Sequence, residues 1–108
     1  MKKKFYRVAF VADLVEKSLK KAQVEGHDIV VARAGSEYFA FAHRCTHRGG
    51  PLAMGELRDY SITCPWHGGI FDIRTGELSH PPPVEHIMSY PLRIVDGAIE
   101  VEVPEKEV

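Results

Sequence analysis

"CTHRGG" (Cys45 to Gly50) and "CPWHGG" (Cys64 to Gly69) carry the only two cysteines of the chain, each followed by a histidine and then by a glycine pair. Together they supply four candidate ligands, Cys45, His47, Cys64 and His67. Two thiolates and two imidazoles suit a soft or borderline metal, and ligands two or three residues apart can converge from one tight turn. We therefore expect the two stretches to face each other around one metal centre.

The glycine pairs indicate which kind of metal centre this is. Gly49–Gly50 and Gly68–Gly69 let the backbone approach closely, and they expose amide N–H groups that can donate to an anion. Bridging sulfides need such donors more than a lone zinc ion does, so the pattern favours an iron-sulfur cluster. Three alternatives stay open: a zinc-stapled interaction module, a Cys45–Cys64 disulfide, which the lack of a secretion signal disfavours, and two unrelated buried cysteines.

The remainder of the chain predicts β structure, because short alternating segments are separated by turn residues and no helical period persists beyond residue 25. The expected strands cover residues 4–10, 19–25, 28–34, 37–42, 90–95 and 98–103. Hairpin turns are expected at Gly26–His27, Gly35–Ser36 and Asp96–Gly97, and a single helical turn near Asp13 to Glu16. The fold class is therefore all-β.

Residues 43–85 differ from the segments on either side. They contain six glycines, five prolines, both cysteines and four of the six histidines. A long irregular stretch inside a compact domain is normally functional. We expect a loop-built insertion that carries the metal centre.

Length and composition limit the function further. A chain of 108 residues with 44% hydrophobic and 27% charged residues is expected to form one globular domain with room for one site. A net charge of -1 does not indicate the basic surface that nucleic-acid-binding proteins usually have. The longest apolar run, Val8 to Ala12, is too short to cross a membrane. Asp13 and Glu16 interrupt the N-terminal apolar segment, which argues against a signal peptide and for a cytoplasmic protein.

The segments "CTHRGGPL" and "CPWHGGIFDIRTGE" resemble the two cluster-binding loops of Rieske 2Fe-2S proteins. The resemblance covers nearly the whole chain, and it is closest to the small ferredoxins of ring-hydroxylating dioxygenase systems. It implies a Rieske fold over residues 1–108, with an antiparallel β meander base and a loop-rich cluster-binding subdomain. It also implies that Cys45 and Cys64 hold one iron and His47 and His67 the other.

The chain departs from the Rieske proteins of cytochrome bc complexes at four positions. Those proteins join their two loops by a disulfide, where this chain has Gly50 and Trp66. They also place a serine and a tyrosine hydroxyl near the cluster sulfurs, where this chain has Gly69 and Phe71. Donors to sulfur stabilise the reduced cluster, so we expect a potential towards the bottom of the Rieske span of about -150 to +300 mV.

The function implied by the resemblance is a soluble one-electron carrier that is not itself an enzyme. Its expected partners are a flavin-dependent reductase and a terminal oxygenase or similar acceptor. A second interpretation is the small subunit of an assimilatory nitrite reductase. A hydroxylating oxygenase needs a further mononuclear iron domain, for which 108 residues leave no space.

Several neighbours of the ligands also receive expected roles. His47 and His67 should lie at the surface, and Arg44, Arg48 and His43 should form a mildly basic docking rim. Phe71, Ile73 and Trp66 should shield the cluster, and Pro81 to Pro83 should form a stiff covering loop. His80 and His86 are not expected to bind metal, because four ligands are already present.

Overall fold

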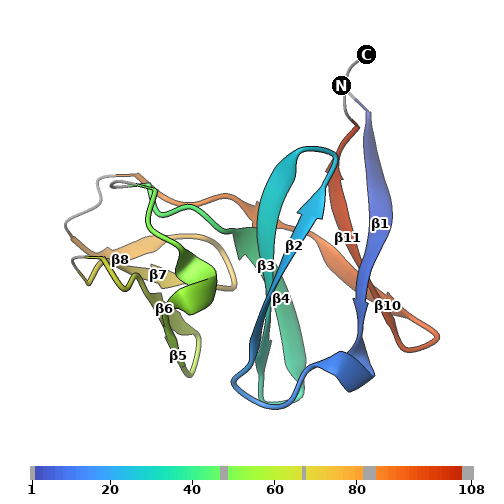
Figure 1. Cartoon of the computed structure of the whole chain (residues 1–108), viewed down its shortest axis with the longest axis horizontal. Coiled ribbons are helices and arrows are strands. Elements are labelled where there is room, and N and C mark those ends of the chain that lie inside the picture. The colour runs from blue at the N-terminus through green and yellow to red at the C-terminus, as the bar shows by residue number, and fades with distance from the viewer. Residues whose placement is uncertain (1, 47–48, 67, 82–84, 106–108) are drawn as a thin grey trace.

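The computed structural model describes residues 2–46, 49–66, 68–81 and 85–105. Its strands form three antiparallel sheets (Figure 1). The first contains β1 (Lys3–Phe10), β11 (Ala98–Pro104) and β10 (Leu92–Val95), in that order. The second contains β2 (Leu19–Val24), β3 (His27–Ala34), β4 (Glu37–Ala42) and β9 (Ser89–Tyr90). The third contains β5 (Glu56–Arg58), β6 (Ser61–Thr63), β7 (Ile70–Asp72) and β8 (Leu78–His80).

Two short 3-10 helices, η1 (Val11–Asp13) and η2 (Leu52–Met54), are the only helical elements in the described ranges. The all-β class expected from the sequence is therefore confirmed. No helix in these ranges is long and apolar enough to span a membrane.

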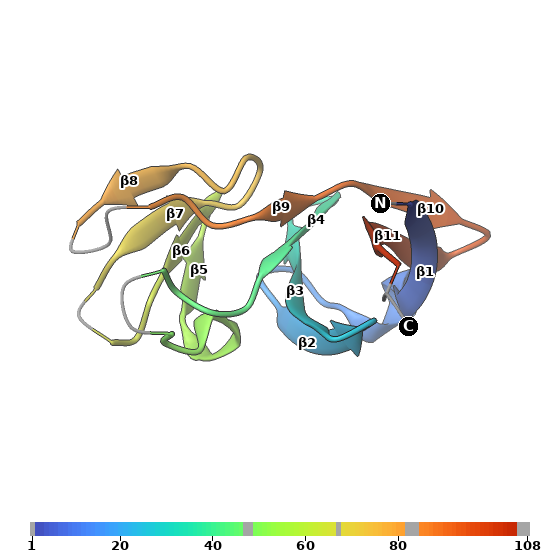
Figure 2. The same ribbon diagram turned by 90° about the horizontal axis from the view of Figure 1, so that it is seen from above.

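The second sheet is the middle layer of the molecule, with the first and third sheets on either side (Figure 2). Its strand β3 is buried on both faces, as the apolar run Ile29 to Ala32 allows. Ile29 and Val31 pack against the first sheet, together with Ile99 and Val101 of β11. Val30 and Ala32 belong to a second core that continues into the third sheet. One strand thus joins the β base to the part that contains the cysteines.

Two of the three hairpin turns occur where the sequence places them. Asp96 and Gly97 have φ angles of 49° and 78°. A two-residue hairpin turn of type I′ requires positive φ at both of its central residues. Gly35 likewise takes a positive φ of 65° between β3 and β4. The expected turn at Gly26–His27 is wrong by one residue, because His27 already pairs with Val24. Glu25 therefore occupies the first turn position, with a φ of 50°.

The helical turn expected near Asp13 to Glu16 lies earlier in the chain, at Val11–Asp13. Asp13 closes this turn instead of opening it, since its carboxylate accepts a hydrogen bond of 2.9 Å from the Phe10 N–H. This is only the N3 half of a capping box, because the carboxylate satisfies the Phe10 N–H while the Phe10 side chain has no acceptor to offer in return.

The expectation that residues 43–85 form only loops is wrong, because they contain the third sheet. Leu57, Ile62 and Phe71 lie opposite one another on β5, β6 and β7 and are all buried. Each of these strands has three residues and buries only its middle one. A strand of that length shows no repeat of alternating polarity, so the sequence pattern could not reveal the sheet.

The turn after β7 provides a test of acid stability. Asp72 accepts hydrogen bonds from the Arg74 backbone N–H and guanidinium, both at 2.8 Å, and these lower the pKa of its carboxyl below the ordinary value. The stabilisation is therefore full above the unfolded pKa near 4 and is lost as the pH falls through the folded pKa. We expect Asp72→Asn to cost about 1 kcal/mol at pH 7, since the pair is partly exposed. In urea unfolding curves the cost should shrink as the pH falls through the folded pKa of Asp72; a cost independent of pH would contradict this.

Candidate metal centre

The two cysteines begin two loops of the same construction. Cys45 follows β4, and its N–H donates to the Gly50 carbonyl at 2.9 Å. Cys64 follows β6, and its N–H donates to the Gly69 carbonyl at 2.8 Å. In each loop the cysteine amide thus reaches the carbonyl five residues later, which is that of the second glycine of the pair.

The first glycine of each pair lets the backbone reverse. Gly49 and Gly68 have φ angles of 70° and 76°, which other residues rarely adopt. The glycine pairs singled out in the sequence therefore shape the loops directly.

The two thiols meet in the core. Cys45 and Cys64 are free, 3% and 1% exposed, and members of one apolar cluster. Burial raises the pKa of the Cys64 thiol, and its hydrogen bond with Cys45 acts in the same direction, while the Trp66 backbone N–H opposes them. Two converging sulfurs, one already receiving a backbone N–H, fit the cysteine half of a Rieske cluster.

The two histidines expected to bind the second iron, His47 and His67, lie outside the described residues. Their expected surface position therefore stays a prediction. Within the described ranges, no group of three metal-binding side chains forms.

Gly50 allows the two loops to approach. A Cβ atom at this position would stand 2.6 Å from the Cys64 sulfur and 3.3 Å from Cβ and Cδ2 of Trp66. The first loop therefore lies so close to the second at Gly50 that a side chain would not fit there without movement of a neighbour. Gly50 and Trp66 occupy the two positions at which the Rieske proteins of cytochrome bc complexes have the cysteines of their disulfide.

The shielding residues are divided between core and surface. Phe71 and Ile73 are fully buried in the cluster that contains both cysteines, as expected. Trp66 is 48% exposed and therefore lies at the surface, and its expected shielding of the cluster's flank stays a prediction.

His43 does not belong to the basic rim. It is 4% exposed, and burial lowers the pKa of its imidazole, with Lys21 and Arg44 adding to the effect. A buried ring whose pKa is lowered does not supply the exposed cation that was expected of His43. Lys21, an exposed cation on β2 that pairs with Val30 of β3, is close enough to contribute to the lowered pKa of His43.

Two further histidines stay outside the proposed ligand set. The Nδ1 atom of His86 accepts a hydrogen bond of 2.8 Å from the Leu78 N–H, which accounts for this side chain without a metal. His80 is exposed at the end of β8. Of the expected proline loop, only Pro81 lies within the described residues.

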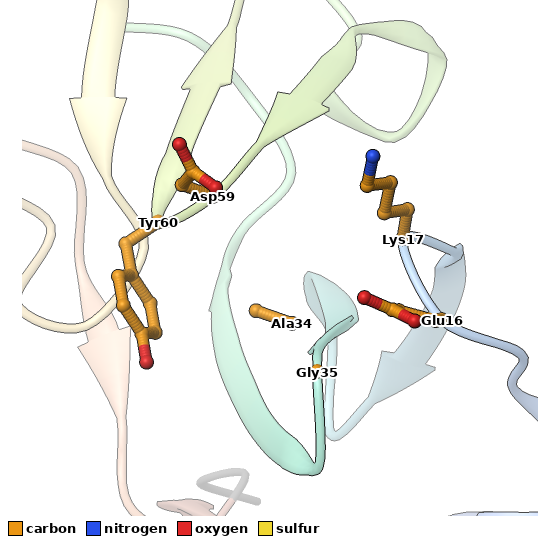
Figure 3. Close-up of a pocket in the computed structure, with 6 residues that line it drawn as sticks. All are labelled: Glu16, Lys17, Ala34, Gly35, Asp59 and Tyr60. Atoms are coloured by element: carbon orange, nitrogen blue, oxygen red, sulfur yellow. The ribbon is translucent and has the colours of Figure 1, made fainter.

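A small pocket of about 220 Å³ lies at the seam between the base and the third sheet (Figure 3). The β5–β6 turn contributes Asp59 and Tyr60, and the Tyr60 hydroxyl donates a hydrogen bond of 2.5 Å to Glu37 of β4. The edge of the Tyr60 ring also contacts Phe39. None of the described residues that line this pocket is a cysteine or histidine, so the pocket does not include the two cysteine loops.

Comparisons with known proteins agree with this geometry. The family described as "Rieske [2Fe-2S] domain" matches residues 4–91. The anthranilate 1,2-dioxygenase ferredoxin subunit of Burkholderia cepacia is 43% identical over 83 residues, which are 76% of this chain and 77% of that protein.

Solved structures resemble the whole fold. The ferredoxin of Sphingomonas yanoikuyae B1 is 30% identical with a TM-score of 0.88, over 94% of this chain and all of that one. A chain in a structure titled as the complex of reduced oxygenase and oxidized ferredoxin in carbazole 1,9a-dioxygenase is 26% identical with a TM-score of 0.86, over 96% of both chains. The match over most of the length, together with the paired cysteine loops, shows that this chain belongs to the Rieske [2Fe-2S] domain family.

Proposed function

We propose that the protein is a one-electron carrier, in which Cys45 and Cys64 hold one iron of a [2Fe-2S] cluster and His47 and His67 hold the other. The observation that carries the proposal is the meeting of the two buried thiols at the base of two equally built loops. When bound, such a cluster supplies one reversible electron. The chain's own residues hold it: the loops present the ligands, and Phe71 and Ile73 exclude water from one side.

The partners follow from the relatives. Ferredoxin names among them support a carrier between a flavin-dependent reductase and a terminal oxygenase or similar acceptor, and not an enzyme in its own right. The same relatives lend no support to the nitrite reductase alternative. The match to a [2Fe-2S] family disfavours the zinc-stapled module.

Residues 1–108 are proposed to work as one Rieske domain in the cytoplasm. The core that contains both cysteines includes Val30 and Phe41 of the base, so the cluster-binding part is not packed as a separate unit.

The docking face is proposed to surround the cluster loops. Trp66 offers an exposed aromatic ring there, and aromatic residues are frequent anchors at protein interfaces. Arg44 and Lys21 are exposed cations on this side, and Asp28 offsets Arg44 only weakly, across 3.8 Å. An acidic patch on the partner would complement this face. Arg48, which we also expected there, lies outside the described residues.

Low-temperature electron paramagnetic resonance tests the proposal directly. The purified protein should be silent as oxidised and should give a rhombic signal after dithionite, with the low average g value of mixed histidine and cysteine ligation. A colourless protein without iron or sulfide would refute the carrier function.

The absence of hydroxyl donors predicts a low midpoint potential. Gly69 and Phe71 are both buried beside Cys64, and neither side chain can donate to sulfur. A hydrogen bond to a charged group contributes about 1.5 to 3 kcal/mol, which corresponds to about 65 to 130 mV for one electron. Gly69→Ser and Phe71→Tyr should therefore each raise the potential by up to about that amount.

Gly69→Ala is the matched control, because it adds the Cβ atom without the hydroxyl. Potentiometric titration followed by electron paramagnetic resonance should place Gly69→Ala near the wild type and Gly69→Ser above it. A wild-type midpoint potential above about +100 mV would overturn this explanation. Equal shifts of the potential in Gly69→Ala and Gly69→Ser would also overturn it.

A further inference from the structure

His43 is the one buried polar side chain among the described residues, and it lies two positions before Cys45. Its backbone joins two parts of the protein. The His43 N–H donates to the Asp28 carbonyl at 3.0 Å, which ties it to β3. Its carbonyl accepts from the Leu52 N–H at 2.8 Å, which ties it to η2. The first cluster loop, residues 44–51, is the segment between these two attachments.

The imidazole adds a third attachment. Its Nδ1 atom accepts a hydrogen bond of 3.2 Å from the Ala53 N–H. The first N–H groups of a helix have no partner inside it, and the residue before η2, Pro51, makes no side-chain cap. His43 therefore supplies both missing acceptors: its carbonyl serves Leu52 and its ring serves Ala53. It caps a helix that begins nine residues later in the sequence.

We propose that His43 is a positioning residue of the cluster centre, whose imidazole closes the base of the first loop by capping η2. The inference rests on the proposed function. The Ala53 N–H is partly buried, so without this acceptor water replaces it poorly. Opening of η2 would move Pro51 and Gly50, and with them the close approach of Gly50 to the Cys64 sulfur. Cys45 would then be held less firmly.

A role in filling the core is the competing explanation, and two substitutions separate the two. His43→Asn keeps an acceptor oxygen close to the Nδ1 position but leaves a void. His43→Leu fills the space but removes the acceptor. If the hydrogen bond matters, the Asn variant resembles the wild type and the Leu variant does not; if packing matters, the order is reversed. His43→Ala shares the void of the Asn variant without its oxygen, which preserves the comparison should the Leu variant not fold.

The first readout is hydrogen exchange by mass spectrometry in peptides that cover residues 52–55 of the cluster-loaded protein. A lost acceptor should speed exchange there about tenfold in the Leu and Ala variants, and less than about twofold in the Asn variant. The second readout is the rate of iron release to a chelator, which should rank the variants in the same order. Equal effects in all variants, or a protected Leu variant, would overturn the proposal.

These readouts separate the inference from the proposed function. Iron and sulfide in the wild-type protein test whether a cluster is carried at all. Exchange at Leu52 and Ala53 tests the cap, and it would still distinguish the variants in a protein that held no cluster.

Discussion

A Cys64→Ala variant should purify colourless, with almost none of the iron and sulfide of the wild type. Each iron of a Rieske cluster has two protein ligands. In the core around Cys64, Cys45 is the only other residue with a sulfur atom, so no further sulfur can replace the lost ligand. Loss of one ligand therefore leaves one iron incompletely held. His47→Ala and His67→Ala should have the same effect. Colorimetric iron and sulfide assays on freshly purified protein measure it.

His80→Ala is the matched control, since it also removes an imidazole near the cluster-binding loops. His80 is exposed at the end of β8 and is not in the proposed ligand set, so this variant should keep its full cluster. A His47→Ala or His67→Ala variant that retains iron and the rhombic signal would show that the ligand set has been assigned incorrectly.

The second large effect is expected at Gly76, in the turn between β7 and β8. This residue has a φ of 82°, and a Cβ atom added to it would stand 2.0 Å from the Ile87 carbonyl oxygen. Its own carbonyl accepts the Ile87 N–H at 2.9 Å, so the two backbones cannot separate without losing that bond. Gly76→Ala should cost about 3 to 4 kcal/mol, from the left-handed backbone and the displacement of the segment around Ile87 together. Thermal unfolding at a fixed heating rate measures the loss.

Gly26 offers a control with nearly the same backbone. Its φ is 81°, and nothing lies within 4 Å of an added Cβ atom. Gly26→Ala should therefore show only the backbone cost of about 1 to 2 kcal/mol. If both variants lost the same stability, contact with Ile87 would not be the cause.

Local features of this protein were predictable from sequence. The Asp96–Gly97 turn needs two adjacent residues that tolerate positive φ, and Gly49 and Gly68 need the same freedom inside the cluster loops. Each requirement is met within a few residues of the chain. The third sheet was missed because its strands are too short to show alternation.

The sequence by itself determined the candidate ligands: two cysteines and two histidines at ligand spacing, with glycine pairs that let each loop turn back on itself. Only the tertiary structure decided how the loops are held. It brought Gly50 against the Cys64 sulfur and buried His43 as the cap of η2. The spacing of ligands in a turn is a local property of the chain. Burial and contact depend instead on the packing of strands that are distant in sequence, here β3 between two cores.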